Sequence, residues 1–187
     1  MNFKIINPVG VPIPNPTKGQ QFGAPRKGHK HEGIDILVKS GTPVLAAADG
    51  EITSSEYQDK KNCGGFVRIK HKQNGNTFYT KYCHLRDIKV PKGKMVKAGE
   101  VIGLSGGGPN DPHRGSSKGA HLHFEIEDIA GNPYNPSNYL NKYYNKPTSS
   151  EKSKDLGILS QIVTPEDFEK LIEPYKNFNI FKGIFTK

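Results

Sequence analysis

The clearest pattern of hydrophobic and polar positions lies in residues 66–82. Residues 66–71 alternate apolar and polar side chains, which is the two-residue period of a strand with one buried face. Asn74-Gly75 follows, a pair that favours tight hairpin turns, and residues 77–82 supply a returning strand. This segment therefore predicts an antiparallel β-hairpin.

Shorter apolar runs repeat the strand signal along the central part of the chain. They are separated by residues that favour turns, mainly Gly, Pro, Asn and Asp. Only 33% of the 187 residues are hydrophobic, while 21 Gly and 14 Pro interrupt long helices. We therefore expect a mainly β fold, with an antiparallel β-sheet core and Gly- and Pro-rich loops. The further strands expected are residues 33–38, 44–48, 51–53 and 120–126, and a pair that ends with residues 101–104 and follows turns around Gly93 and Gly99.

The two ends of the chain differ from this central region. Residues 1–24 contain four prolines in their first sixteen positions and predict an extended N-terminal arm. Residues 20–145 hold the main domain, and the polar residues 146–155 are typical of a linker. In the C-terminal tail, residues 156–187, Thr164 and Pro165 have the character of a helix start. The aromatic end of this tail either packs back on the core or docks onto a protein partner.

The chain carries a formal net charge of +9, with the basic residues scattered along it. A basic surface attracts polyanions, but no Arg-rich segment interleaved with aromatic residues is present, so specific nucleic-acid recognition has little support. The charge is more typical of a generally basic, solubilising surface. No apolar run approaches the length of a membrane span.

Two cysteines flank the predicted hairpin. Pairing about the Asn74-Gly75 turn would place Phe66 opposite Cys83, which leaves Cys63 about 10 Å away along the ladder. A disulfide needs Cα atoms roughly 4.4–6.8 Å apart. A bulge at Gly64-Gly65 would close this gap. The sequence leaves both alternatives, a disulfide and two free thiols, open.

Two patterns of polar residues are candidates for chemistry. His31 and Asp35 are four residues apart in an extended segment, so an imidazole and a carboxylate share one face and suit Zn(II). Alone, such a pair is more often a surface histidine near an aspartate. His121 and His123 are two residues apart in a predicted strand and therefore point the same way. Two neighbouring imidazoles on a core strand are difficult to explain by packing alone.

Other histidines carry a weaker signal. Tyr82 and His84 end the predicted hairpin, and alternation would put both on one face. His113 lies in a Gly- and Pro-rich loop, where it either contacts substrate or is an exposed loop residue. His29 and His71 are interpreted as a bystander and a structural residue.

These elements together resemble the lysostaphin/LytM-type zinc endopeptidases, whose pattern is His-x-x-x-Asp, then Tyr-x-His-Leu, then His-x-His. The resemblance covers about residues 20–136 and implies a LytM-like fold with a lipoyl-like half-barrel motif. The loop of residues 106–119 departs from the usual short form, which leaves substrate preference open. The three elements stand here as His31 to Asp35, Tyr82-Cys83-His84-Leu85 and His121-Leu122-His123, with supporting similarity in residues 22–26, 41–50 and 96–103.

The resemblance implies one Zn(II) per chain, bound by His31, Asp35 and His123. It also implies that His121 and His84 are the unligated catalytic pair. Tyr82 either assists the transition state or is a buried, hydrogen-bonded tyrosine. The implied activity is hydrolysis of peptide bonds in bacterial peptidoglycan, in the stem peptide or the cross-bridge.

Several alternatives to this activity exist. A non-catalytic module would bind peptidoglycan or activate another hydrolase, and relatives of that type have lost metal ligands that this chain keeps. A lipoyl-type carrier domain would explain the run around Thr42-Pro43 and the position of Lys94, but it needs none of the histidines.

The implied place of action is the bacterial cell wall, either extracellular or in the periplasm. The N-terminal residues contain no apolar run typical of a signal peptide. We therefore expect either a mature protein whose export signal has been removed, or a phage virion component that uses residues 156–187 for docking.

Overall fold

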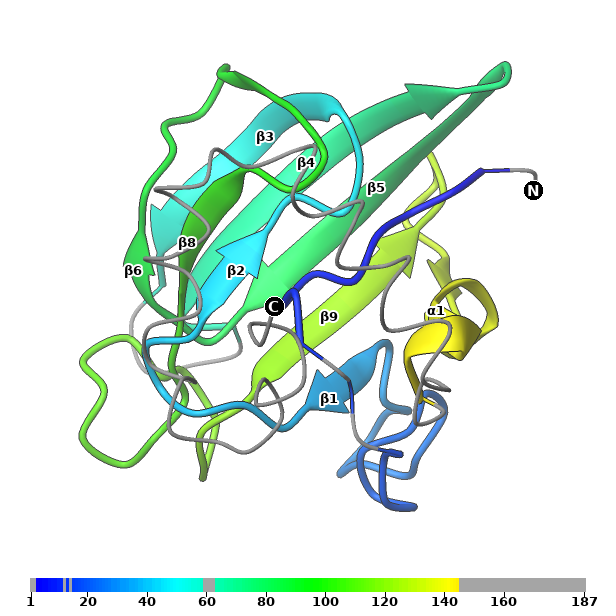
Figure 1. Ribbon diagram of the computed structural model, residues 1–187. Helices are drawn as coiled ribbons and strands as arrows, with labels where there is room; N and C mark the ends of the chain where they lie inside the picture. The colour runs from blue at the N-terminus through cyan, green and yellow to red at the C-terminus, as the bar shows by residue number, and fades with distance from the viewer. Residues whose placement is uncertain (1–2, 12, 14, 59–62, 145–187) are drawn as a thin grey trace, which may run out of the picture. The chain divides into compact units, whose positions relative to one another are not determined.

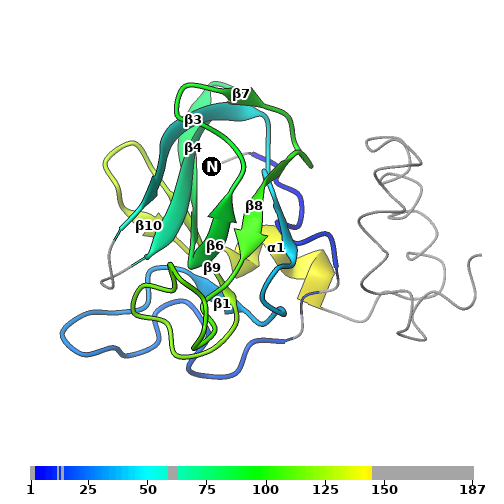
Figure 2. The ribbon, with the colours of Figure 1, turned by 90° about the vertical axis from the view of Figure 1, so that its left-hand side faces the viewer.

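Two antiparallel sheets form the described part of the chain, which is residues 3–144 without 12, 14 and 59–62, in a computed structural model (Figure 1). The larger sheet has the order β1–β9–β5–β4–β3–β7, with β10 also paired to β9. The smaller sheet, β2–β8–β6, lies across one face of the larger sheet (Figures 1 and 2). The expected mainly antiparallel β fold is confirmed. The elements are β1 (Ile34–Ile36), β2 (Pro43–Leu45), β3 (Gly50–Tyr57), β4 (Gly65–Gln73), β5 (Asn76–Cys83), β6 (Leu85–Ile88), β7 (Met95–Val96), β8 (Val101–Ser105), β9 (Leu122–Glu127), β10 (Pro133–Tyr134) and α1 (Ser137–Tyr144).

The hairpin expected from residues 66–82 is the pair β4–β5 at the centre of the larger sheet. Asn74 and Gly75 both have positive φ, 50° and 75°, as a tight hairpin turn requires. The register pairs Val67 with Tyr82 and Gln73 with Asn76. The sequence therefore predicted both the turn and the pairing that it sets.

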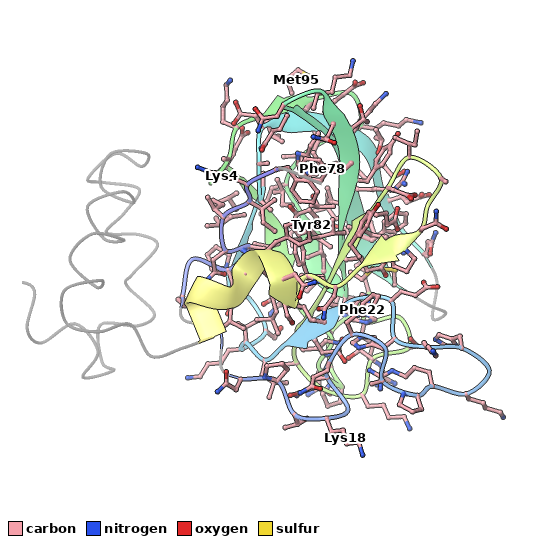
Figure 3. The ribbon with its side chains drawn as sticks, turned by 90° about the vertical axis from the view of Figure 1, so that its right-hand side faces the viewer. Lys4, Lys18, Phe22, Phe78, Tyr82 and Met95 are labelled. Atoms are coloured by element: carbon pink, nitrogen blue, oxygen red, sulfur yellow. A yellow bond between two sulfur atoms is a disulfide. The ribbon has the colours of Figure 1, made fainter. Side chains whose placement is uncertain are left out.

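The hydrophobic core lies between the two sheets and extends under the N-terminal arm. The Phe3 ring stacks on the Phe78 ring of β5 at 3.8 Å and on the Tyr139 ring of α1 at 4.4 Å. Phe78 and Tyr82, labelled in Figure 3, are fully buried. The arm thus covers the end of the core with the side chains of Phe3, Ile5, Val9 and Ile13.

Three elements were not anticipated from the sequence, namely β6, β10 and α1. The start of α1 does carry a local signal, because the Asn135 side chain accepts a hydrogen bond from the Ser137 N–H at 3.0 Å, with Pro136 between them. Leu140 anchors the helix in the core. None of the helical residues that the structure describes forms a segment long and apolar enough to cross a membrane.

The described residues belong to one compact unit, Met1–Lys146. The linker expected at 146–155 and the tail expected at 156–187, with its helix start at Thr164, lie outside the described residues. The use of that tail for docking therefore stays a prediction.

The structure shows a disulfide rather than two free thiols. Cys63 and Cys83 are bonded, with their Cα atoms 4.7 Å apart. The β4 ladder begins at Gly65, and Gly64 before it has a φ of +64°, a left-handed conformation that suits glycine. This turn carries Cys63 back towards the end of β5, which closes the gap expected from regular pairing.

Candidate metal and catalytic site

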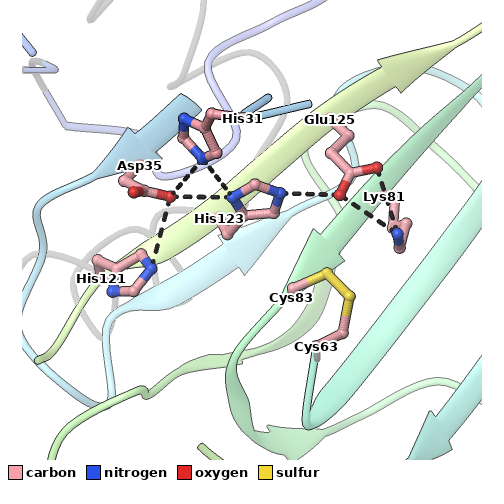
Figure 4. Close-up of a disulfide and its surroundings, with 8 residues drawn as sticks. All are labelled: His31, Asp35, Cys63, Lys81, Cys83, His121, His123 and Glu125. Atoms are coloured by element: carbon pink, nitrogen blue, oxygen red, sulfur yellow. Dashed lines mark hydrogen bonds and ion pairs between the residues drawn. A yellow bond between two sulfur atoms is a disulfide. The ribbon is translucent and has the colours of Figure 1, made fainter. Parts of the chain in front are cut away.

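The side chains of His31, Asp35 and His123 converge on one point (Figure 4). Asp35 in β1 is the direct cross-strand partner of His123 in β9, so their side chains share a face of the sheet. The Nε2 atom of His31 lies 3.0 Å from Asp35 Oδ1 and 3.0 Å from His123 Nδ1. Asp35 Oδ1 and His123 Nδ1 are 2.9 Å apart. The sheet pairing therefore brings together residues that are 88 positions apart in the chain.

A close backbone approach allows β1 to lie against β9. Gly33 stands immediately before β1, and a Cβ atom at this position would be 2.3 Å from the carbonyl oxygen of Phe124. Any larger residue would push β1 away from β9. The glycine thus fixes the distance at which Asp35 meets His123.

Hydrogen bonds to the far side of each ring decide which nitrogens face the centre. His31 Nδ1 lies 2.8 Å from the carbonyl oxygen of Gln21, which can only accept, so Nδ1 carries a proton and Nε2 is the nitrogen that faces the centre. His123 Nε2 lies 2.8 Å from the Glu125 carboxylate, so Nε2 carries a proton and Nδ1 is the nitrogen that faces the centre. One nitrogen of each ring and a carboxylate oxygen thus face one another at 2.9–3.0 Å.

This donor set fits a divalent metal ion. Three electronegative atoms at this separation need a proton or a cation between them. Zn(II) takes imidazole nitrogen and carboxylate oxygen at about 2.0–2.2 Å, and three such ligands on a tetrahedron are roughly 3.3 Å apart. The observed separations of 2.9–3.0 Å are close to this value. The three residues fit a zinc site in both chemistry and spacing.

The electrostatics of Asp35 favour its charged form. Burial would raise the pKa of this carboxyl, but hydrogen bonds with His123 and His31 hold it well below its usual range. Arg26 adds a further contact, with Nη2 3.1 Å from Asp35 Oδ2. Asp35 is therefore available as an anionic ligand across the physiological pH range.

Glu125 and Lys81 form an outer layer behind His123. Glu125 is 4% exposed, and Lys81 Nζ lies 3.2 Å from each of its two carboxylate oxygens. Burial lowers the pKa of His123, but hydrogen bonds to Asp35 and Glu125 outweigh burial and raise that pKa to about 9. Carboxylates behind a histidine ligand fix its tautomer and orientation, which is what this contact does here.

His121 lies beside the three candidate ligands, His31, Asp35 and His123, without being one of them. Its Nδ1 is 2.8 Å from the Gly119 carbonyl oxygen, so the proton is on Nδ1 and the bare Nε2 faces Asp35 Oδ1 at 3.5 Å. Ser117 Oγ also contacts Nδ1 at 3.2 Å. Burial lowers the pKa of His121, which keeps the ring neutral and able to accept a proton at neutral pH.

His84 reaches the site by leaving the strand. Its φ is +63°, a left-handed conformation that is uncommon outside glycine, so the alternation expected from β5 stops at Cys83. The His84 ring then lies edge-on to the His121 ring at 4.7 Å and 6.0 Å from the His123 ring. Burial, and next the neighbouring imidazoles, lower the pKa of His84 to about 3, so its ring is neutral.

Tyr82 does not share the environment of His84, although alternation predicted one face for both. The Tyr82 side chain is fully buried, and its hydroxyl accepts a hydrogen bond from the Ala47 N–H at 2.8 Å. A second hydrogen bond at 2.9 Å joins it to the Thr80 hydroxyl. Burial raises the pKa of Tyr82. These contacts favour the structural alternative for this tyrosine.

The remaining histidines lie away from the cluster. The His113 ring contacts the Tyr57 ring at 4.0 Å, and its carbonyl oxygen accepts a hydrogen bond from the Gly65 N–H at 2.9 Å. Its loop and the loop before β1 lie at the same end of the molecule (Figure 2). His29 is exposed, and His71 is fully buried in β4.

Sequence reasoning missed the supporting residues Glu125, Lys81 and Arg26. Glu125 had a signal, since it continues the two-residue period of His121 and His123 on the same face of β9. Lys81 and Arg26 had none, because their contacts depend on which strands and loops become neighbours.

Comparison with known proteins agrees with this geometry. The peptidoglycan DD-endopeptidase ShyA of Vibrio cholerae is 38% identical over 105 residues, which cover 56% of this chain and 22% of that protein. Among solved structures, lysostaphin from Staphylococcus simulans has 27% identity and a TM-score of 0.56, over 70% of this chain and 51% of that chain. A zinc-containing peptidase from Vibrio cholerae has 28% identity and a TM-score of 0.53, over 67% and 38% of the two chains.

The match to ShyA thus spans about a fifth of that curated relative. The family model described as "Peptidase family M23" matches residues 29–136. This match covers more than half of the chain and contains all three elements of the sequence pattern. The expected resemblance to lysostaphin-type proteins is confirmed. This chain belongs to peptidase family M23.

Proposed function

We propose that this chain is a zinc-dependent endopeptidase that hydrolyses a peptide bond of bacterial peptidoglycan. The observation that carries the proposal is the convergence of the ligand atoms of His31, Asp35 and His123 on one point. The names of the matched relatives, which include a peptidoglycan DD-endopeptidase and a zinc-containing peptidase, support the substrate and the metal.

The residues beside these three candidate ligands support catalysis rather than binding alone. A bound Zn(II) would supply a Lewis acid and a water molecule of lowered pKa. The bare Nε2 of His121 is placed to accept a proton from the attacking water and to return it to the leaving amine. His84, held neutral by burial, is the second imidazole proposed to stabilise the oxygen that becomes negative in the transition state, and its ring is held by a hydrogen bond to the Arg114 backbone.

The alternative function is a non-catalytic module that binds peptidoglycan or activates another hydrolase. Such a module needs neither the metal ligands nor a proton acceptor. The convergence of His31, Asp35 and His123, with His121 beside them, supports the enzyme.

Metal analysis and cell-wall clearing by three variants test the proposal. The wild type should contain about one zinc per chain and clear a suspension of purified walls. His31→Ala should lose the metal and the activity together. His121→Ala should keep the metal and lose activity by about 10²- to 10⁴-fold, the usual contribution of a general base.

His29→Ala is the matched control, since His29 is exposed, lies two residues before His31 and its ring lies 3.2 Å from the Lys27 carbonyl oxygen, away from the three ligand atoms. Its activity should equal that of the wild type. Equal activity in all variants would refute the proposal, and wall binding without clearing would establish the non-catalytic alternative.

The bond that is cut lies within the stem peptide or the cross-bridge, and mass analysis of fragments from defined walls will identify it. The proposed place of action is the cell wall. Association with a phage virion stays a prediction from the sequence.

A further inference from the structure

We propose that the Cys63–Cys83 disulfide is a positioning element of the active site, which holds the backbone that presents His84. The proposal rests on the proposed function to the extent that His84 takes part in the reaction. It goes beyond that function, because it assigns a role to a bridge that the metal ligands and the proton acceptor do not require.

The bridge lies on the same face of the larger sheet as His123 and Glu125. Cys83 is the last residue of β5, is fully buried and pairs across the sheet with His123 (Figure 4). His84 follows it at once, and the His84 N–H donates a hydrogen bond to the carbonyl oxygen of Cys63 at 2.8 Å. A covalent bond and a hydrogen bond therefore join the same two segments on either side of the Cys83–His84 peptide.

The conformation of His84 needs such a restraint. A non-glycine residue with a φ of +63° is in a disfavoured backbone conformation, which persists only where the surrounding structure enforces it. The Nδ1 atom of His84 is buried and has no hydrogen-bond partner in the described part of the chain. The ring is held by a hydrogen bond to the Arg114 backbone, and the backbone of His84 is tied to Cys63.

The segment next to Cys63 is also joined to the loop that supports His121. The Gly65 N–H donates to the His113 carbonyl oxygen at 2.9 Å, and a Cβ atom on Gly64 would lie 2.1 Å from the same oxygen. The loop that begins there reaches Ser117, whose hydroxyl contacts His121 Nδ1. The bridge thus fixes a junction shared by the supports of both proposed catalytic histidines.

Reduction gives a defined change at this junction. A phosphine donates two electrons to the S–S bond, the two sulfurs take up two protons from water as thiols, and the phosphine leaves as its oxide. Bonded sulfurs are about 2.05 Å apart, whereas non-bonded atoms need roughly 3.5–4 Å. The sulfurs must therefore separate by about 1.5 Å, and a misplacement of about 1 Å near a reacting group can lower turnover about 100-fold.

The experiment compares three zinc-loaded proteins on one peptide substrate, namely the oxidised wild type, the phosphine-reduced wild type and the double variant Cys63→Ser, Cys83→Ser. For the last two we expect kcat to fall 10- to 100-fold, with KM within about two-fold and zinc content unchanged. Exchange of the His84 amide proton with solvent, followed by NMR after selective ¹⁵N-histidine labelling, should become faster in both. The His84→Ala variant assigns that signal.

Two controls separate positioning from general effects. Phosphine added to the double variant should change nothing, because that variant has no bridge to reduce. Ile69→Val, at a buried position of β4, should lower the melting temperature and leave kcat unchanged. All assays are run below the melting temperature of each protein, and the reduced wild type decides the question if the double variant fails to fold.

Unchanged kcat without the bridge, or loss of zinc together with kcat, would overturn the proposal. So would an unchanged rate of His84 amide exchange. A wild type that cleaves no peptide would instead overturn the proposed function, while faster His84 exchange on reduction would still support the positioning role.

Discussion

The hydroxyl of Tyr82 offers a direct test of how this tyrosine contributes, because the sequence allowed either a catalytic or a structural role. Tyr82→Phe removes one oxygen atom and preserves the ring. In the structure that oxygen accepts a hydrogen bond from the Ala47 N–H at 2.8 Å and bonds to the Thr80 hydroxyl at 2.9 Å, in a fully buried environment. The variant therefore leaves the Ala47 N–H without a partner.

The expected cost follows from these contacts. An unsatisfied buried donor costs about 1–3 kcal/mol, while the Thr80 hydroxyl keeps the His71 ring as a partner at 2.7 Å. We therefore expect Tyr82→Phe to lower the free energy of unfolding by about 2 kcal/mol. For a chain of this length that corresponds to a fall in melting temperature of about 4–8 °C.

Urea denaturation and steady-state kinetics on the same preparations measure the two roles separately. Tyr79→Phe is the matched control, since Tyr79 belongs to the same strand, is only partly buried and has its ring covered by the Arg68 guanidinium. The structural role predicts lost stability in Tyr82→Phe alone, with kcat unchanged in both variants. A ten-fold fall in kcat without any loss of stability would refute this reasoning and return Tyr82 to the catalytic group.

Two further predictions concern the support of the site and the core. Glu125→Gln should weaken zinc binding about ten-fold, because His123 loses a charged partner. Chelator competition near pH 9 measures this affinity. The control is Glu127→Gln, at the next acidic residue on that face, which should change the affinity less than two-fold. Burial lowers the pKa of His71 to about 4, so the unfolded chain binds the extra proton, and stability falls as the pH drops from about 6.5 to 4. His71→Gln should therefore lose about 3 kcal/mol less than the wild type over this pH range in urea titrations, because other buried groups such as His84 keep their own acid loss. An equal acid loss in that variant would contradict the prediction.

Local sequence determined most of the strands, though not β6 and β10, together with the central turn and the order of the chemical elements. The alternation in β4 and β5 and the pair Asn74-Gly75 are properties of neighbouring residues, so they can be recognised without knowing the fold. For the same reason, the shared direction of His121 and His123 followed from strand geometry alone. The roles expected for the individual histidines and for Asp35 came instead from the resemblance of the spaced motifs to a known family.

Tertiary structure decided which side chains and backbone groups come into contact. The pairing of Asp35 with His123 depends on β1 lying against β9, which no local period specifies. The tautomers of the histidines depend on carbonyl oxygens of the backbone, at Gln21 and Gly119, which have no side-chain signature. Register, ring orientation and the left-handed turn at His84 arise from contacts between distant segments, and only the folded chain contains those contacts.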